Sequence, residues 1–256
     1  MRQFLANVWH LFVRGLRSAV RLPTFLVLSL VQPIFWLLLF APLMARVAAV
    51  PGFGATSYLD FAAPGIAVMT ALFSAVWSGV GLLQDMERGV LDRFLVTPVS
   101  RGALIGGRVL NAALQVAFQA AIVLAVAALA GGRARGGVPG IVVALVAAAL
   151  LAVLLAACSS ALALLARRQE ALVAAVNFVA LPLSSLSSMI MASALMPGWI
   201  RAVARWNPVD WAVVAARAGY DGRWERLPAA LAPLAGGALL AVFLATRSFD
   251  RYLRSL

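Results

Sequence analysis

Lysine is absent from this sequence, so arginine supplies all 21 of its basic residues. A Walker-type phosphate loop depends on a lysine that reaches the phosphates of ATP, and a Schiff-base enzyme depends on a lysine amine. The chain therefore carries neither chemistry itself. Cysteine is almost as scarce, since Cys158 stands alone in an apolar run. That excludes an internal disulfide, and we interpret Cys158 as a small core residue.

Charge is the second scarcity, because only 12% of the residues are charged while 64% are hydrophobic and the mean hydropathy is +0.97. A soluble domain usually carries about twice that share of charge. Lipid offers no partner to backbone polar groups, so the chain must satisfy them within helices. The alternating pattern of a membrane barrel is also missing. The composition predicts a single all-α integral membrane domain over 1–256.

The formal net charge of +12 indicates a partner of negative charge. The arginines are scattered between apolar runs and do not gather on one soluble basic face, so we expect no nucleic acid partner. The headgroups of membrane lipids are the better partner.

Six apolar stretches each approach the roughly 20 residues that a bilayer requires. They predict transmembrane helices at about 22–45, 61–83, 109–130, 139–166, 171–196 and 227–246. An even number of spans places both termini on one side. If that side is cytoplasmic, 13 of the 21 arginines lie on it, and such an excess favours the cytoplasmic side.

Two segments outside these spans, 3–21 and 197–226, have sequence patterns typical of a membrane interface. Residues 3–21 alternate polar and apolar positions at helical spacing, which predicts an amphipathic helix in the headgroup plane. A signal peptide is the alternative, but the next apolar stretch is much longer than the roughly 7–15 residues of a signal core. The segment 197–226 faces outward in this topology. Its tryptophans, among them Trp199, Trp206 and Trp211, predict a segment that dips into the outer interface.

No ionisable residue lies within the six predicted spans away from their edges. Proton- or sodium-coupled transporters usually keep such residues at depth, so an ion-driven pump is disfavoured. The chain also lacks the catalytic residues that an intramembrane enzyme needs, because His10 is the only histidine and lies outside the spans. We therefore expect no catalytic site and no bound metal or cofactor. Any energy for transport would come from a separate ATPase.

A few polar residues do fall within the spans. They could line a substrate path or form hydrogen bonds between helices, and the sequence does not choose between these roles. The candidates for a substrate path are Gln115, Gln119, Asn177, Ser184 and Ser188.

The charged segment 85–98 predicts a short helix that Pro98 ends. One face would be apolar and the other charged. The apolar face would hold Val90, Leu91, Phe94 and Leu95, and the charged face Glu87, Arg88, Asp92 and Arg93. An ordinary solvated loop helix is the alternative.

The same segment resembles the cytoplasmic loop of type-2 ABC permeases, the transmembrane subunits of drug and polysaccharide exporters, among them the daunorubicin-resistance type. The family pattern has a charged pair, a glycine, a leucine-acid-arginine run and Thr-Pro-Val-Ser-Arg. The matching residues here are Glu87, Arg88, Gly89, Leu91, Asp92, Arg93, Phe94, Leu95, Thr97, Pro98, Val99, Ser100 and Arg101. Phe94 is a departure, because leucine is commoner there.

A second similarity follows the fifth predicted span. The family shows Pro-Leu before small residues, then Leu-Pro-x-Trp and later Asn-Pro. This chain has Pro182-Leu183, then Met196-Pro197-Gly198-Trp199, then Asn207-Pro208. The resemblance implies short external re-entrant helices over 197–226. The serines at 184, 185, 187 and 188 replace a common Phe-x-Ser-Gly, which leaves the shape of the fifth helix open.

The resemblance implies a permease that moves a drug-like or lipid-like amphiphile out of the cytoplasm or inner leaflet. It implies that 85–98 is a coupling helix on a cytoplasmic ABC ATPase, that ATP binds only to that partner, and that a second permease copy or paralogue completes a dimer. An ATPase-independent channel or a membrane scaffold stays open as an alternative. Abundant alanine and arginine suggest a GC-rich genome, hence a bacterial inner membrane.

Overall fold

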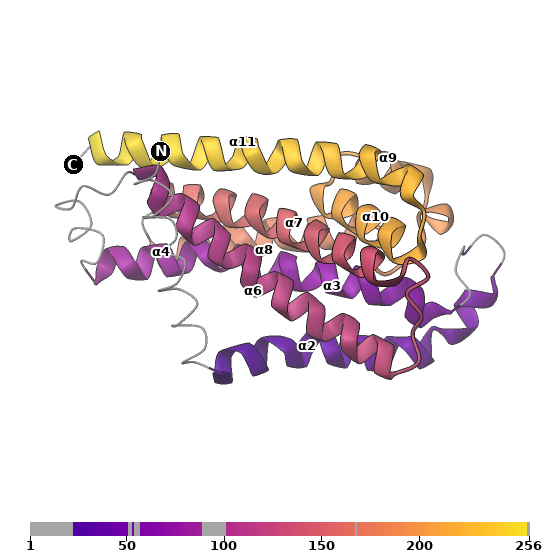
Figure 1. The fold of residues 1–256 in the computed structure, drawn as a ribbon. Coiled ribbons are helices and arrows are strands. Elements are labelled where there is room, and N and C mark those ends of the chain that lie inside the picture. The colour runs from indigo at the N-terminus through magenta and orange to yellow at the C-terminus, as the bar shows by residue number, and fades with distance from the viewer. Residues whose placement is uncertain (1–22, 51–52, 54–56, 89–100, 167, 255–256) are drawn as a thin grey trace.

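The computed structural model describes residues 23–50, 53, 57–88, 101–166 and 168–254, and every regular element within them is helical (Figure 1). The α-helices are α2 (Pro23–Leu43), α3 (Tyr58–Val76), α4 (Ser78–Glu87), α6 (Arg101–Leu129), α7 (Gly137–Ala166), α8 (Gln169–Ser185), α9 (Gly198–Ala204), α10 (Pro208–Asp221) and α11 (Leu227–Arg254). Short 3-10 helices are η1 (Ala45–Ala49), η2 (Ser193–Leu195) and η3 (Trp224–Arg226). The predicted all-α class is confirmed, whereas the interface helix at 3–21 lies outside the described residues.

Among the described residues, four helical stretches are long and apolar enough to cross a membrane. They are Tyr58–Glu87, Ile105–Leu129, Gly137–Ala166 and Trp224–Phe249, and Ser29–Leu43 is a shorter apolar helix. The chain is therefore a multi-pass membrane protein. The total of six spans stays a prediction.

Helix α7 lies at the centre of the bundle, with α3, α6, α10 and α11 packed against it. It carries many alanines, and Ala144, Ala148 and Ala152 are fully buried in its contacts. Small side chains allow helices to approach closely in a membrane, where packing replaces the hydrophobic effect as the force between helices. The alanine-rich sequence of this span thus explains its central place.

The predicted span over 61–83 is interrupted, because α3 ends at Val76 and α4 begins at Ser78. The break brings Gly79 against α7, where its N–H donates to Ser159 Oγ at 3.1 Å. A Cβ at Gly79 would lie 2.4 Å from the carbonyl oxygen of Ser159. Glycine is therefore required at this crossing of α4 and α7.

Helix α8 ends at Ser185, whereas we expected the fifth span to run to Met196. Serine hydroxyls compete with the helix for backbone acceptors at this point. Ser184 Oγ donates to the carbonyl of Leu181 at 2.8 Å, and Ser187 Oγ to that of Ser184 at 2.7 Å. The chain then continues without regular structure over 186–192, which we call the serine loop.

Helices α9 and α10 occupy the segment expected to form short external helices. Asn207 caps α10, since its Oδ1 accepts from the N–H of Val209 at 2.9 Å and Pro208 follows at the first helical position. Gly222 ends the helix with a left-handed φ of 76°. Close contact with α7 fixes α10, because a Cβ at Gly140 would lie 2.2 Å from Gly219 O.

The bundle has two distinct ends (Figure 1). At the Glu87 end, α4 ends at Glu87, α6 begins at Arg101 and α11 ends at Arg254. At the opposite α10 end lie α9, α10 and the serine loop. The first described helix, α2, also begins toward the Glu87 end, so the chain enters and leaves the described bundle on the same side.

Candidate functional site

At the Glu87 end, one ion pair joins α6 to α4. Arg108 Nη2 lies 2.5 Å from Asp85 Oδ2, and Arg108 Nη1 donates to the carbonyl of Ser78 at 3.4 Å. The side chains of Arg108 and Asp85 keep 23% and 30% of their surface exposed. Arg108 thus contacts both the first turn and the last turn of α4, and that last turn includes the start of the predicted coupling segment 85–98.

The predicted coupling residues are only partly within the described structure. Glu87 closes α4 and Arg88 follows it as the C-cap, and both side chains are exposed. The other six, Val90, Leu91, Asp92, Arg93, Phe94 and Leu95, lie outside the described residues. The structure therefore shows how α4 leads to this segment and leaves its contact with an ATPase as a prediction.

Gln119, one of the candidates for a substrate path, is fully buried. Its Nε2 donates to Ser29 Oγ at 2.7 Å, and its Oε1 accepts from Ser74 Oγ at 2.7 Å. These bonds join α6 to α2 and α3. Gln119 therefore acts as an interhelical link, which was the alternative role that the sequence left open.

The other candidates lie in different surroundings. Gln115 is half-buried one turn before Gln119, while Asn177 is exposed on α8. Ser184 Oγ donates within its own helix, and Ser188 is buried in the serine loop. Of the five residues, Ser188 lines the pocket described below.

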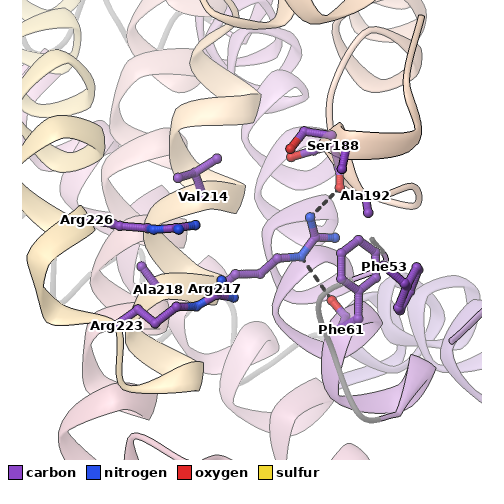
Figure 2. Close-up of a pocket in the computed structure, with 11 residues that line it drawn as sticks. Phe53, Phe61, Ser188, Ala192, Val214, Arg217, Ala218, Arg223 and Arg226 are labelled. Atoms are coloured by element: carbon purple, nitrogen blue, oxygen red, sulfur yellow. Dashed lines mark hydrogen bonds between the residues drawn. The ribbon is translucent and has the colours of Figure 1, made fainter. Parts of the chain in front are cut away.

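The α10 end contains a buried arginine that sequence reasoning counted only as an external charge. Arg217 is 8% exposed and projects from α10 toward the serine loop and α3 (Figure 2). Its guanidinium donates to three carbonyls, those of Phe61 at 3.1 Å, Ser188 at 2.5 Å and Met189 at 2.6 Å. It also lies 3.5 Å from the centre of the Phe61 ring, a cation–π contact.

These contacts stabilise the charged guanidinium of Arg217 in a buried site. Burial lowers the pKa of Arg217 to about 9, while the nearby carboxylates of Asp210 and Asp221 oppose that shift. The guanidinium is therefore still charged at neutral pH. A Cβ at Gly65 would lie 2.4 Å from Met189 O and 3.0 Å from Arg217 Nη2. The glycine in α3 therefore leaves the space that the guanidinium and the serine loop occupy.

Other polar side chains hold the serine loop from both sides. Asp210 Oδ1 accepts from the N–H of Ser188 at 2.7 Å. Asn207 Nδ2 donates to the carbonyls of Leu183 at 2.8 Å and Leu186 at 3.0 Å, and Tyr58 donates to that of Ile190 at 3.0 Å. The loop thus satisfies its backbone through side chains of α3 and α10.

A pocket of about 260 Å³ opens beside Arg217. Phe53 and Phe61 form part of its wall, and the cationic side chains come from α10 and the chain that follows it (Figure 2). Its polar lining residues include Ser188, Arg217, Arg223 and Arg226.

Two features of the lining are chemically unusual. Ser188 Oγ is buried and has no hydrogen-bond partner within the described structure. The two outer arginines have acidic neighbours: Arg223 pairs with Asp221, and Arg226 Nε lies 4.0 Å from Glu225. None of the described residues that line the pocket is acidic. Across the described ranges there is no cluster of three or more His, Cys, Asp or Glu that could hold a metal.

Sequence reasoning included Ser188 as a candidate and did not single out Arg217 or Asp210. A signal was present, because Arg217 follows Ala212 to Ala216, a run of small apolar residues that a solvated helix rarely has. An arginine in such a run indicates a buried, bonded guanidinium.

Comparison with known proteins gives a consistent result over most of the chain. Residues 6–220 match the family model described as ABC-2 type transporter. The chain is 28% identical over 241 residues to the daunorubicin resistance ABC transporter permease protein DrrB1 of Streptomyces coeruleorubidus. The match covers 93% of this chain and 83% of that protein.

Shorter matches link the chain to the putative transport permease ycf38 of two algae. Identity is 33% over 97 residues in Cyanophora paradoxa and 34% over 106 residues in Porphyra purpurea. These matches span 38% and 41% of this chain, and 33% and 35% of the algal proteins. They are similar to this chain over part of its length only.

Proposed function

The chain belongs to the ABC-2 type transporter family and is a transmembrane permease subunit of an ABC exporter, and we propose that it moves a drug-like or lipid-like amphiphile with energy from a separate ATPase. The match to the family over residues 6–220 carries this proposal. The relative named for daunorubicin resistance, similar over nearly the whole of both chains, supports an amphiphilic drug as cargo.

The ATPase is a separate subunit, because this chain has no lysine for a phosphate-binding loop. It binds below the Glu87 end, where the exposed Glu87 and Arg88 lead into the coupling segment. Closure of two ATPase subunits on ATP pushes that segment. The push reaches α4, which Arg108 connects to α6 and Gly79 connects to α7.

A second copy of the permease, or a paralogue, completes the transporter. The cargo then crosses between the two permeases, and the chain itself forms no covalent bond with it. The unit resides in the inner membrane of a bacterium with both termini in the cytoplasm. The common end of the first and last described helices supports that topology (Figure 1).

The direct test is reconstitution. The permease and the ATPase encoded beside its gene would be purified together and placed in vesicles, with daunorubicin and a fluorescent phospholipid as trial cargoes. We expect ATP-dependent movement of at least one cargo and a fixed ratio of ATPase to permease. An ATPase that never copurifies, together with ATP-independent flux, would establish the channel or scaffold alternative.

Orientation is tested by labelling single cysteines in a Cys158→Ser background. We expect Ser100→Cys and Gly198→Cys to react with an impermeant thiol reagent from opposite sides of the membrane. Position 198 accepts a side chain freely, because a Cβ there has no atom within 4 Å. Labelling of both from one side would refute the topology.

A further inference from the structure

The pocket beside Arg217 has the composition of an anion site. Three arginines and a buried serine hydroxyl line it, and the lining residues within the described ranges include no acidic one. Arginine guanidinium groups match the geometry of phosphate and carboxylate oxygens, and their hydrogen bonds to such oxygens are strong. Membrane headgroups are rich in such groups, and the pocket lies at one end of the bundle, next to the short helices α9 and α10.

The unpaired hydroxyl of Ser188 is the most informative detail. It is buried with no hydrogen-bond partner among the described residues, and leaving a buried polar group unpaired is unfavourable. The backbone of the same residue is fully used, since its N–H donates to Asp210 and its carbonyl accepts from Arg217. The serine loop therefore holds this hydroxyl at the pocket wall, where no described residue forms a hydrogen bond with it.

Arg217 has spare donors as well. A guanidinium carries five N–H groups, and three bond to the carbonyls of Phe61, Ser188 and Met189. Two N–H groups thus have no partner among the described residues. Because the backbone bonds fix the group in place, these donors are preorganised for a ligand.

The size of the pocket limits what can enter it. Pockets for whole drug-sized molecules usually measure about 300–1,000 Å³, and this one measures about 260 Å³. A single water occupies about 30 Å³ in the liquid, so the space exceeds that of one or two waters. It fits the charged head of a molecule, with Phe53 and Phe61 beside the first carbons of an apolar tail.

We propose that this pocket binds the phosphate group of an anionic ligand, with Ser188, Arg217 and Arg226 as donors. Arg223 adds a second cation at the rim. The phosphate belongs either to a lipid headgroup or to a free phosphate ion. The inference concerns binding alone and goes beyond the proposed export function, so it does not need an ATPase.

The test uses purified full-length permease in an uncharged detergent. Binding of inorganic phosphate, of dihexanoyl phosphatidic acid and of dihexanoyl glycerol would be measured by calorimetry. We expect one or both phosphate compounds to bind and dihexanoyl glycerol, which lacks the phosphate, not to bind. Tighter binding of phosphatidic acid identifies a lipid headgroup, and equal binding identifies free phosphate as sufficient.

Variants locate the site. Ser188→Ala should weaken phosphate binding about tenfold, because a hydrogen bond to a charged group contributes at least that factor. It should not lower the melting temperature, since the hydroxyl bonds to none of the residues that the structure describes. The double variant R223Q/R226Q should weaken binding by a similar factor, most strongly at low salt.

Arg205→Gln is the matched control, because Arg205 is exposed near the same end and lies outside the pocket. Its affinity should equal that of the unmodified protein. Absence of binding by both phosphate compounds at millimolar concentration overturns the proposal. Unchanged affinity in Ser188→Ala and in R223Q/R226Q also overturns it, since binding would then occur elsewhere. Neither result bears on ATP-driven transport, which the reconstitution measures separately.

Discussion

At the Glu87 end, Arg108 bonds to Asp85 and Ser78 of α4 while 23% of its side chain stays exposed. At the α10 end, in contrast, Arg217 is 8% exposed and donates to three backbone carbonyls. An ion pair that water reaches contributes little and separates at low cost. A buried guanidinium that satisfies several acceptors is costly to disturb. We therefore expect the α10 end to keep its arrangement during transport and the Glu87 end to change.

The strongest challenge to this comparison is Arg217→Ala. Leaving a buried acceptor without its donor costs about 1–3 kcal/mol, and the carbonyls of Phe61, Ser188 and Met189 would all lose their donor. We expect a large fall in the melting temperature in detergent. Arg205→Ala, at an exposed site near the same end, is the control and should leave the melting temperature unchanged. Equal melting temperatures for the two variants would contradict a structural role for Arg217.

At the Glu87 end we expect substitutions to lower the affinity for the ATPase. Glu87→Ala and Leu91→Asp should leave membrane insertion intact and weaken ATPase binding. Truncating one member of a desolvated charge pair costs about 2–5 kcal/mol, and an exposed apolar patch is expected at a protein contact. ATPase affinity and stimulated hydrolysis would be measured in the reconstituted complex.

Glu225→Ala is the control for the coupling variants, because Glu225 is exposed at the opposite end. It should bind the ATPase as the unmodified permease does. If Glu87→Ala and Leu91→Asp also retain full affinity and hydrolysis, the segment is an ordinary solvated connection.

Gly79→Ala tests the connection between α4 and the central helix. The new methyl would lie 2.4 Å from the carbonyl oxygen of Ser159, and overpacking of this kind costs about 1–3 kcal/mol. Gly81→Ala, two residues on, would meet only Arg108 Nη1 at 3.3 Å and should cost less. Melting temperatures compare the two. A smaller loss for position 79 than for position 81 would show that the contact with α7 is not tight.

The smallest expected effect on stability is that of Asp85→Asn. The ion pair with Arg108 is partly exposed, and such pairs contribute about 0.2–1 kcal/mol. We expect a shift of the melting temperature far below that of Arg217→Ala. A loss as large as that of Arg217→Ala would erase the difference between the two ends.

The sequence predicted the class of fold well because composition decides it. The span expected over 139–166 coincides closely with α7 (Gly137–Ala166), since an uninterrupted apolar run leaves no alternative to a helix in lipid. Predictions failed in detail at boundaries. The end of α8 at Ser185 depends on serine hydroxyls and on distant donors, and the break before α4 depends on packing against Ser159.

The candidate site was predicted less well. Ser188 was selected as a polar residue at depth, yet its partners come from α10, and Gln119 proved to link helices. Whether a polar residue contacts substrate or forms a structural hydrogen bond depends on which side chains come into contact in the folded protein. Hydropathy and residue spacing do not predict those contacts.

The sequence by itself determined that this chain crosses a membrane as helices, because that property follows from composition. The absence of lysine predicted in addition that a separate subunit hydrolyses ATP. Only the tertiary structure decided which arginine is buried. Arg217 is tolerated because carbonyls 28, 29 and 156 positions away in the sequence converge on its guanidinium. The cost of burying a charge depends on the partners that surround it, and those partners are brought together only when the chain folds.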